Sequence, residues 1–278
     1  MVNEHCSLDL ADVHTLCEAA VDYVLQNVNT VGYIIKGIEE ITLKAFPRER
    51  IKCLKADPVS LLGSENTSSL TNLPTVDFSS ISAGYMWQRT RPDCEKGDIV
   101  LIEDYLTLMN QAPQNHTPSA LEESKPDTKI KDTTNLSSSV DLTTELEKYH
   151  KNVLNFVERN LRHELIHAFD DVRGHIDSAD CFHQACSEVR AARLSGDCFV
   201  GEELKRGRFD YFEGGLKCVQ RRATMALETN PICRGFSKRA VDTVFQRCYS
   251  DYEPFAAPVY TMGSYGERRF ETGVLKQK

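Results

Sequence analysis

The chain of 278 residues contains no apolar run of the roughly 18 to 20 residues that a membrane-spanning helix needs. Its first residues, MVNEHCSLDLAD, are acidic where a secretory or transit segment would be basic, so we expect no cleavable targeting segment. It also lacks the clustered Lys and Arg of a nucleic-acid surface, because 33 basic residues are scattered among 41 acidic ones and the formal net charge is −8. Nucleic acid is not expected as a partner.

Several motifs of other enzyme classes are missing as well. No G-x-S-x-G nucleophile elbow and no phosphate-binding G-x-x-x-x-G-K loop occurs in the sequence. No C-x-x-C pair occurs either, so a structural zinc site built from cysteine pairs is not expected. These absences argue against serine hydrolases, P-loop enzymes and zinc ribbons.

Cysteine, by contrast, is abundant. An even number permits complete disulfide pairing in an oxidising compartment, whereas buried reduced thiols would pack as small apolar groups. The residue pattern alone leaves both readings open. The ten cysteines are Cys6, Cys17, Cys53, Cys94, Cys181, Cys186, Cys198, Cys218, Cys233 and Cys248.

The first 46 residues have the pattern of two amphipathic helices, separated near Asn29. We expect both helices to belong to the core. Their apolar faces consist of Leu10, Val13, Cys17, Ala20, Val21 and Val24 in the first helix, and Val31, Ile34, Ile35, Ile38 and Ile41 in the second.

Two short strands at 83–88 and 99–102, joined by a turn-rich stretch, predict an antiparallel hairpin. Residues 56–82 and 111–144 are of low complexity. The second of these stretches has almost no large apolar side chains and is predicted to be a disordered insertion, with order returning at Glu145.

Helical periodicity dominates the rest of the chain. Further helices are predicted at 183–194, 215–229 and 237–249, with Gly196 as a left-handed cap and Ser237 as an N-cap. The fold class we expect is α+β: one mostly helical domain over residues 1–278 with a small antiparallel sheet. Before these helices, an apolar stripe of Leu154, Val157, Leu161, Leu165 and Ala168 places residues 163–167 inside a helix.

Within that helix stands the sequence H-E-L-I-H, from His163 to His167. Residues i and i+4 lie on one helix face, so the two imidazoles can bind one metal ion, as in the zincins. Glu164 could then accept the proton of a zinc-bound water, as the catalytic base of a zinc metalloendopeptidase. An ordinary solvated helix with incidental histidines is the competing reading, and a third ligand would decide between them.

The third ligand is expected to be Glu188, in the E-x-x-x-A pattern of gluzincins on the next predicted helix. Asp177, His175 and His183 are alternatives. A metzincin site is excluded because Asp170 and Arg173 stand where that motif needs Gly and its last ligand.

Three charged residues near the motif have two readings each. Asp170 could accept a hydrogen bond from a ligand imidazole or pin an arginine, or it could be a surface carboxylate. For Arg190 and Arg193, a structural ion pair with Asp170 or Asp171 is favoured over contact with a substrate.

Four blocks follow one another from 163 to 255: HELIHAFD at 163–170, ACSEVRAARLSGDC at 185–198, CVQRRAT at 218–224 and AVDTVFQRCYSDYEPF at 240–255. In these blocks the chain resembles the mitochondrial inner-membrane metalloprotease family that processes and assembles ATP synthase subunit 6.

The resemblance implies a zinc endopeptidase peripherally attached to the inner membrane, on its intermembrane-space side. It would bind one catalytic zinc ion through His163 and His167, with Glu164 as the base. Its partner would be an inner-membrane precursor of the subunit 6 type, and it would assist ATP synthase assembly. The resemblance also favours disulfides over reduced thiols. The alternative function is a non-proteolytic assembly chaperone with a vestigial or structural metal site.

The chain departs from the family in several places. Cys53 is followed by Leu54, Lys55 and Ala56 where the family commonly has C-x-x-C, and Val172 stands where the family has a Cys in the motif helix. Cys181 and Cys233 are additional, so the disulfide pairing of the family does not transfer to this chain.

Overall fold

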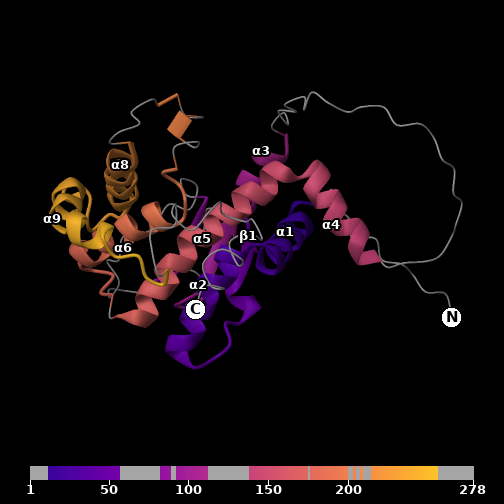
Figure 1. The fold of residues 1–278 in the computed structure, drawn as a ribbon, viewed down its shortest axis with the longest axis horizontal. Coiled ribbons are helices and arrows are strands. Elements are labelled where there is room, and N and C mark those ends of the chain that lie inside the picture. Colours follow the sequence, from indigo (N-terminus) through magenta and orange to yellow (C-terminus); the bar gives the residue numbers. More distant parts are fainter. Residues whose placement is uncertain are drawn as a thin grey trace, which may run out of the picture.

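The computed structural model describes residues 12–56, 82–88, 92–111, 138–174, 176–199, 203–204, 207–208 and 214–255. The helix that carries the motif, α5 (Lys151–Arg173), runs through the middle of the molecule (Figure 1). Helices α1 (Val13–Asn27) and α2 (Asn29–Thr42) pack against it on one side, and α6 (Cys181–Leu194) packs against it on the other. The motif therefore lies between two groups of helices.

The two N-terminal helices are confirmed. Asp12 caps α1, because its carboxylate accepts the backbone N–H of Thr15 at 2.9 Å. The second helix ends where Leu43 adopts a left-handed backbone conformation with φ of 56°. Most of the predicted apolar face is buried, but Ile41 is exposed, and Leu10 lies outside the described residues.

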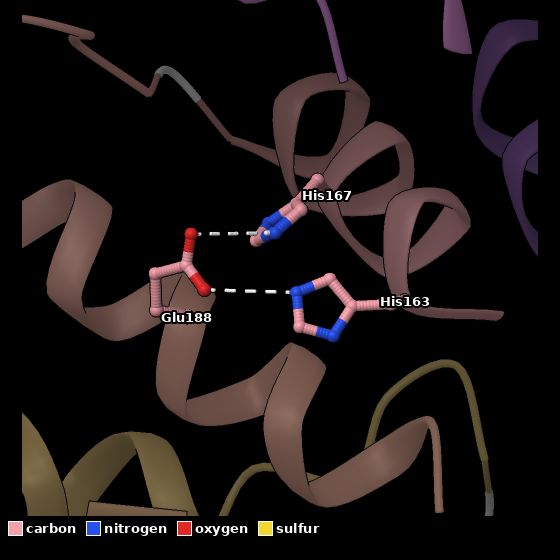
Figure 2. Close-up of side chains that lie close together, drawn as sticks. All are labelled: His163, His167 and Glu188. Atoms are coloured by element: carbon pink, nitrogen blue, oxygen red, sulfur yellow. Dashed lines mark ion pairs between the residues drawn. The ribbon is translucent and has the colours of Figure 1, made fainter. Parts of the chain in front are cut away.

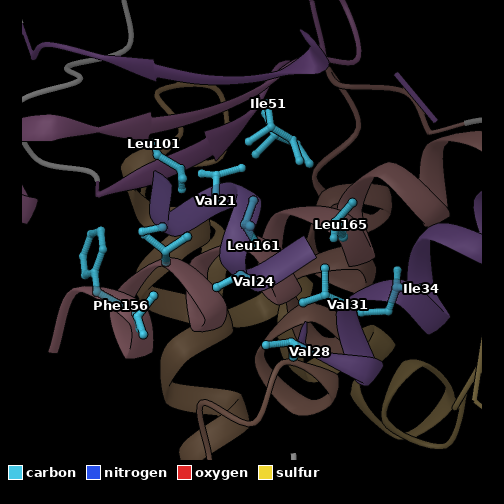
Figure 3. Packing of buried hydrophobic residues seen from close by; sticks show 14 of the residues in the cluster. Val21, Val24, Val28, Val31, Ile34, Ile51, Leu101, Phe156, Leu161 and Leu165 are labelled. Atoms are coloured by element: carbon cyan, nitrogen blue, oxygen red, sulfur yellow. The ribbon is translucent and has the colours of Figure 1, made fainter. Parts of the chain in front are cut away.

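The larger hydrophobic core joins α1 and α2 to α5 and to the sheet. Figure 3 shows Leu161 and Leu165 of α5 among the valines of α1 and α2. Both leucines are fully buried, and a buried Leu contributes about 1.5–3 kcal/mol relative to an exposed one. This burial holds one face of the motif helix against the core and leaves the opposite face for the histidines.

A smaller core lies between α6, α8 (Gly214–Thr229) and α9 (Ser237–Tyr249). Ala185, Val189 and Ala192 of α6 are buried in it, and their small side chains allow close packing. Three disulfides, Cys181–Cys233, Cys186–Cys248 and Cys198–Cys218, cross-link this part of the chain, and a fourth, Cys17–Cys53, joins α1 to the first strand. The preference for disulfides over reduced thiols is confirmed for these eight cysteines.

The sheet consists of β1 (Ile51–Leu54), β2 (Ala83–Tyr85) and β3 (Ile99–Ile102), in the spatial order β1-β3-β2. The short helix η1 (Arg48–Arg50) directly precedes β1. Strands β2 and β3 form the predicted antiparallel hairpin. The prediction of an antiparallel sheet is nevertheless wrong, because β1 pairs with β3 in parallel and makes the sheet mixed. Four residues with a central lysine gave too weak a pattern to reveal β1.

Two further helices within the described residues are α3 (Glu103–Gln111) and α4 (Ser138–Tyr149). Helix α4 begins seven positions before Glu145, so the predicted end of the insertion at residue 144 is wrong. The rest of the two low-complexity stretches, residues 57–81 and 112–137, lies outside the described residues. Helices α6, α8 and α9 begin within two residues of the predicted starts.

Two predicted helix caps differ in outcome. Gly196 has a positive φ of 88° after α6, as predicted. Ser237 is not the N-cap of α9 but its first residue; its hydroxyl donates to Glu228 and lies 3.1 Å from the carbonyl oxygen of Cys233. None of the helices within the described ranges combines the length and the apolar character required to cross a bilayer.

Candidate metal centre and cleft

His163 and His167 lie one turn apart on α5 and point to the same side (Figure 2). Their ring centroids are 5.0 Å apart. The i, i+4 spacing predicted this arrangement. The two imidazoles can therefore present nitrogen atoms to one common point.

Glu188 reaches that point from α6. Its Oε2 atom lies 3.6 Å from Nε2 of His163, and its Oε1 atom lies 3.6 Å from Nε2 of His167. One ligand atom from each of the three residues lies within 4.8 Å of the others. Two helices thus supply two nitrogens and one carboxylate to a single small volume.

The donor set fits a metal ion. Glu188 Oε2 is buried and has no hydrogen-bond partner, although a buried carboxylate oxygen without one is costly. The distances of 3.6 Å to the imidazoles are longer than hydrogen bonds, and a cation between the three groups would satisfy all of them. Two histidines and one glutamate are the protein ligands of one class of catalytic zinc site.

The alternative third ligands lie elsewhere. Asp177 is exposed, and its carboxylate accepts the backbone N–H of Ala179 at 2.9 Å, as expected for a turn residue. His183 Nδ1 accepts the backbone N–H of Asp177 at 3.2 Å. His175 is outside the described residues. Among the described candidates, only Glu188 joins the two motif histidines.

A carboxylate supports the far side of His163. Asp197 Oδ2 lies 3.3 Å from Nδ1 of His163 and accepts a hydrogen bond of 2.9 Å from Arg222 of α8. Burial lowers the pKa of His163, but Asp197 and Glu188 outweigh this effect and raise it well above its ordinary value. The pKa of Asp197 is held below its usual range by His163 and Arg222, despite its burial.

A hydroxyl supports the far side of His167. Its Nδ1 lies 2.8 Å from the Ser187 hydroxyl, which donates to Asp170 at 2.9 Å. Asp170 in turn accepts Nε of the fully buried Arg190 at 2.8 Å. Both imidazoles thus direct Nε2 toward Glu188 while Nδ1 is occupied, an arrangement that fixes ring orientation in metal sites.

Of the predictions for the neighbouring charged residues, that for Arg190 is confirmed and that for Arg193 is not. Asp170 is a buried residue rather than a surface carboxylate, and its ion pair with Arg190 is confirmed. Arg193 does not follow the predicted pairing, since its guanidinium stacks on the rings of Tyr249 and Tyr252. Asp171 instead accepts the hydroxyl of Tyr85 at 2.8 Å.

Glu164 is buried beside the three candidate ligands. Burial raises its pKa to about 7, and the carboxylate of Glu188 acts in the same direction. The charge of His163 and the backbone N–H of Tyr85, which donates to the carboxylate, oppose this shift. A carboxylate with such a pKa can accept and return a proton near neutral pH.

Two adjoining hollows of about 270 Å³ and about 420 Å³ share His163 and Glu164 in their walls. Ala83 of β2 and Ala226 of α8 line both of them. A continuous cleft therefore passes over the motif helix, with β2 on one side and the C-terminal part of α8 on the other.

The strand that borders this cleft is at the edge of the sheet. Within the described residues β2 pairs only with β3. Ser82 and Met86 make their backbone hydrogen bonds to β3, so the backbone N–H and C=O of the intervening Ala83 point away from it. The edge can offer main-chain hydrogen bonds to an extended peptide in the cleft.

Sequence reasoning missed Asp197, Ser187 and the role of Tyr85. Each reaches the site through tertiary contacts from α6, the segment after it, or the strand β2. The only available signal was proximity in the sequence: Ser187 precedes the expected third ligand, and Asp197 lies in the block 185–198.

Comparison with known proteins covers the part of the chain that contains the candidate ligands. Residues 127–256, which include His163, Glu164, His167 and Glu188, match the family model described as Peptidase M76 family. This part of the chain is similar to the Peptidase M76 family. No solved structure matches the chain.

Curated relatives that match the chain carry the printed name mitochondrial inner membrane protease ATP23, some as "homolog". The Homo sapiens protein is 40% identical over 144 residues, covering 49% of this chain and 58% of that protein. The Xenopus laevis protein is 46% identical over 101 residues, which cover 36% of this chain and 43% of that protein. The Saccharomyces cerevisiae protein (strain ATCC 204508 / S288c) is 42% identical over 105 residues, which cover 36% of this chain and 46% of that protein. The chain thus spans about half the length of these relatives.

Proposed function

We propose that the chain is a zinc-dependent endopeptidase with one gluzincin-like metallopeptidase domain. The observation that carries the proposal is the convergence of His163, His167 and Glu188 beside the buried Glu164, on the floor of the cleft between β2 and α8. Peptidase M76 enzymes are metallopeptidases, which supports the reading of this donor set as a metal site.

In the proposed mechanism, an extended peptide lies in the cleft and forms main-chain hydrogen bonds with the edge of β2 at Ala83. When bound, the zinc ion would polarise the carbonyl of the cleaved bond and lower the pKa of a water molecule. Glu164 accepts the proton of the attacking water and returns it to the leaving amine. The buried position of Glu164 and its pKa of about 7 suit both transfers.

The printed names of the relatives support the proposed location, and the proposed substrate rests on the sequence resemblance described above. We infer peripheral association with the mitochondrial inner membrane on its intermembrane-space side, where an oxidising environment suits the four disulfides. The proposed substrate is an inner-membrane precursor of the ATP synthase subunit 6 type, and the proposed wider role is assistance in ATP synthase assembly. Protease protection of the chain in mitoplasts would contradict the assigned side of the membrane.

The metal site is tested by elemental analysis of the purified full chain. We expect one zinc ion per chain, and its loss in His163→Ala and in Glu188→Ala. Asp177→Ala is the matched control, because it removes the competing third ligand and should leave the zinc content unchanged. Zinc retained by Glu188→Ala but lost from Asp177→Ala would contradict the proposed site.

The catalytic role of Glu164 is tested by Glu164→Gln. This variant should keep its zinc and its fold but cleave the precursor at least about 100-fold more slowly, the usual contribution of a general base. Undiminished cleavage would overturn the mechanism. Rescue of ATP synthase assembly by the inactive variant would assign the cellular role to chaperoning instead.

A further inference from the structure

The two halves of the cleft differ in chemistry. The half of about 270 Å³ beside His167 contains the apolar side chains of Trp87, Pro231 and Ile232 and is here called the apolar half. Most of its other lining residues away from the metal site are small or polar and uncharged, among them Gln88, Ser178, Gln184, Thr229 and Asn230. Apart from the metal-site residues themselves, its lining contains no charged side chain. The other half contains the charged residues Arg159, Arg222 and Asp197 together with Phe156 and Met225. The two halves therefore differ in charge, and an apolar group beside Trp87 would meet no charged side chain outside the metal site.

Trp87 forms the wall of the apolar half that lies against His167. Its ring meets the ring of His167 edge to face, with 5.5 Å between centroids, and it meets Tyr85 in the same way at 4.9 Å. These contacts fix the indole in place. A group resting on Trp87 would lie next to the atoms that react.

Ile232 forms the opposite rim. Its side chain is 46% exposed, and it follows α8 in a turn in which the side chain of Asn230 accepts the backbone N–H of Ile232 at 3.0 Å. The neighbouring Cys233 is bonded to Cys181 of α6, so the rim is covalently attached to the helix that carries Glu188. Ile232 is thus held on a fixed support at the rim of a hollow that also contains Trp87, where a ligand could cover both side chains.

We propose that the apolar half binds a large apolar side chain of the substrate, belonging to a residue adjacent to the cleaved bond. This inference rests on the proposed peptidase function. An aliphatic or aromatic side chain would remove Trp87 and Ile232 from water. An acidic side chain would lie near Glu164 and would lose its hydration without gaining a partner. Trp87 and Ile232 would therefore determine the specificity at this position.

The chain contains a single tryptophan, so its fluorescence reports on this half of the cleft alone. We would titrate zinc-loaded Glu164→Gln protein with two tryptophan-free decapeptides that differ only at the two central residues, Leu-Leu or Ser-Ser. The Leu peptide should change the Trp87 emission and bind at least about ten-fold more tightly than the Ser peptide, as expected for apolar side chains in an apolar pocket. Equal affinities would overturn the proposal.

A substitution at the rim tests the residue assignment. In the same background, Ile232→Ser should remove most of the preference for the Leu peptide, and because Ile232 is half exposed this change should cost little stability. The matched control is Leu216→Ser on α8, since Leu216 is 42% exposed and lines neither half of the cleft. An unchanged preference in Ile232→Ser, or an equal loss in Leu216→Ser, would refute the assignment.

Hydrolysis of the two peptides by the zinc-loaded wild-type chain separates this inference from the proposed function. A Trp87 response to the Leu peptide without any hydrolysis would contradict the peptidase function and leave the apolar binding site standing. Hydrolysis of both peptides with equal kcat/KM, in the wild type and in Ile232→Ser alike, would support the peptidase and overturn the apolar site.

Discussion

Asp197 Oδ2 lies 3.3 Å from Nδ1 of His163, on the opposite side of the imidazole from Glu188. The arrangement leaves Nε2 of His163 as the nitrogen directed at the candidate metal. Arg222 holds the same oxygen of Asp197 at 2.9 Å, so the carboxylate is anchored before any metal binds.

Asp197→Asn should weaken zinc binding by about 10- to 100-fold, the usual effect of losing a residue that supports a metal ligand. The amide keeps the volume of the carboxylate but not its charge, so the fold should persist. Competition with a fluorescent zinc chelator measures the change. Asp171→Asn is the control, because Asp171 lies on the same helix as His163 but contacts Tyr85 and Lys96 rather than a candidate ligand. Equal losses in both variants would show that only helix stability had changed.

Ser187→Ala should weaken zinc binding by about ten-fold, because His167 Nδ1 loses the hydroxyl that fixes its orientation. It should also lower the free energy of unfolding by about 1–3 kcal/mol, since Asp170 loses a buried hydrogen-bond donor. Urea denaturation and chelator competition measure the two effects. Ser250→Ala removes an exposed hydroxyl at the end of α9 and should change neither. Wild-type zinc affinity in Ser187→Ala would exclude the proposed role of this hydroxyl.

The metal-ligand candidates could be predicted from the sequence because their geometry is local. His163 and His167 share a helix, and helical spacing alone puts them on one face. Glu188 required one further assumption, that the next helix packs closely against the first, and the small alanines that follow Glu188 supported it. The structure brings the three together as that reasoning expected.

The residues that support the ligands could not be predicted in the same way. Asp197 contacts His163 only because the chain turns at Gly196 after α6 and is then joined to α8. Likewise, β1 could not be recognised as a parallel strand, since its partner β3 lies far along the chain and parallel pairing leaves no turn signal. The periodicity of apolar residues reveals helices and strands, whereas these contacts depend on how the chain runs between those helices and strands.

Zinc binding should release protons. In the metal-free chain the pKa of His163 is raised well above its ordinary value, so this imidazole is protonated at neutral pH and must lose its proton to bind the ion. His167, with a pKa lowered to about 4 by burial, is already neutral. Affinity should therefore rise close to ten-fold per pH unit up to the pKa of His163, and then level off.

Calorimetry at pH 7 in two buffers of different ionisation enthalpy counts these protons. We expect about one proton from His163 and a further fraction from Glu164, whose pKa of about 7 the nearby cation would lower. On zinc binding, the Glu164→Gln variant should release only the proton from His163. Zinc binding without proton release would contradict the charged state of His163 described above.

The disulfide Cys198–Cys218 joins the residue after Asp197 to α8, one turn before Arg222. It therefore holds together the two residues that fix the far side of His163. Replacing both cysteines by serine should lower the free energy of unfolding by about 3 kcal/mol, as expected for a loop of this length. The same change should weaken zinc binding, because the disulfide no longer keeps Asp197 and Arg222 close together.

The matched control is the double serine variant of Cys17 and Cys53, whose disulfide joins α1 to β1 away from the metal site. It closes a loop of 36 residues and should destabilise the chain by a similar amount without lowering the zinc affinity of the folded protein. Thermal unfolding and chelator competition distinguish the two variants. If both lose the same affinity, the effect of Cys198–Cys218 comes from global stability, and its proposed control over His163 is wrong.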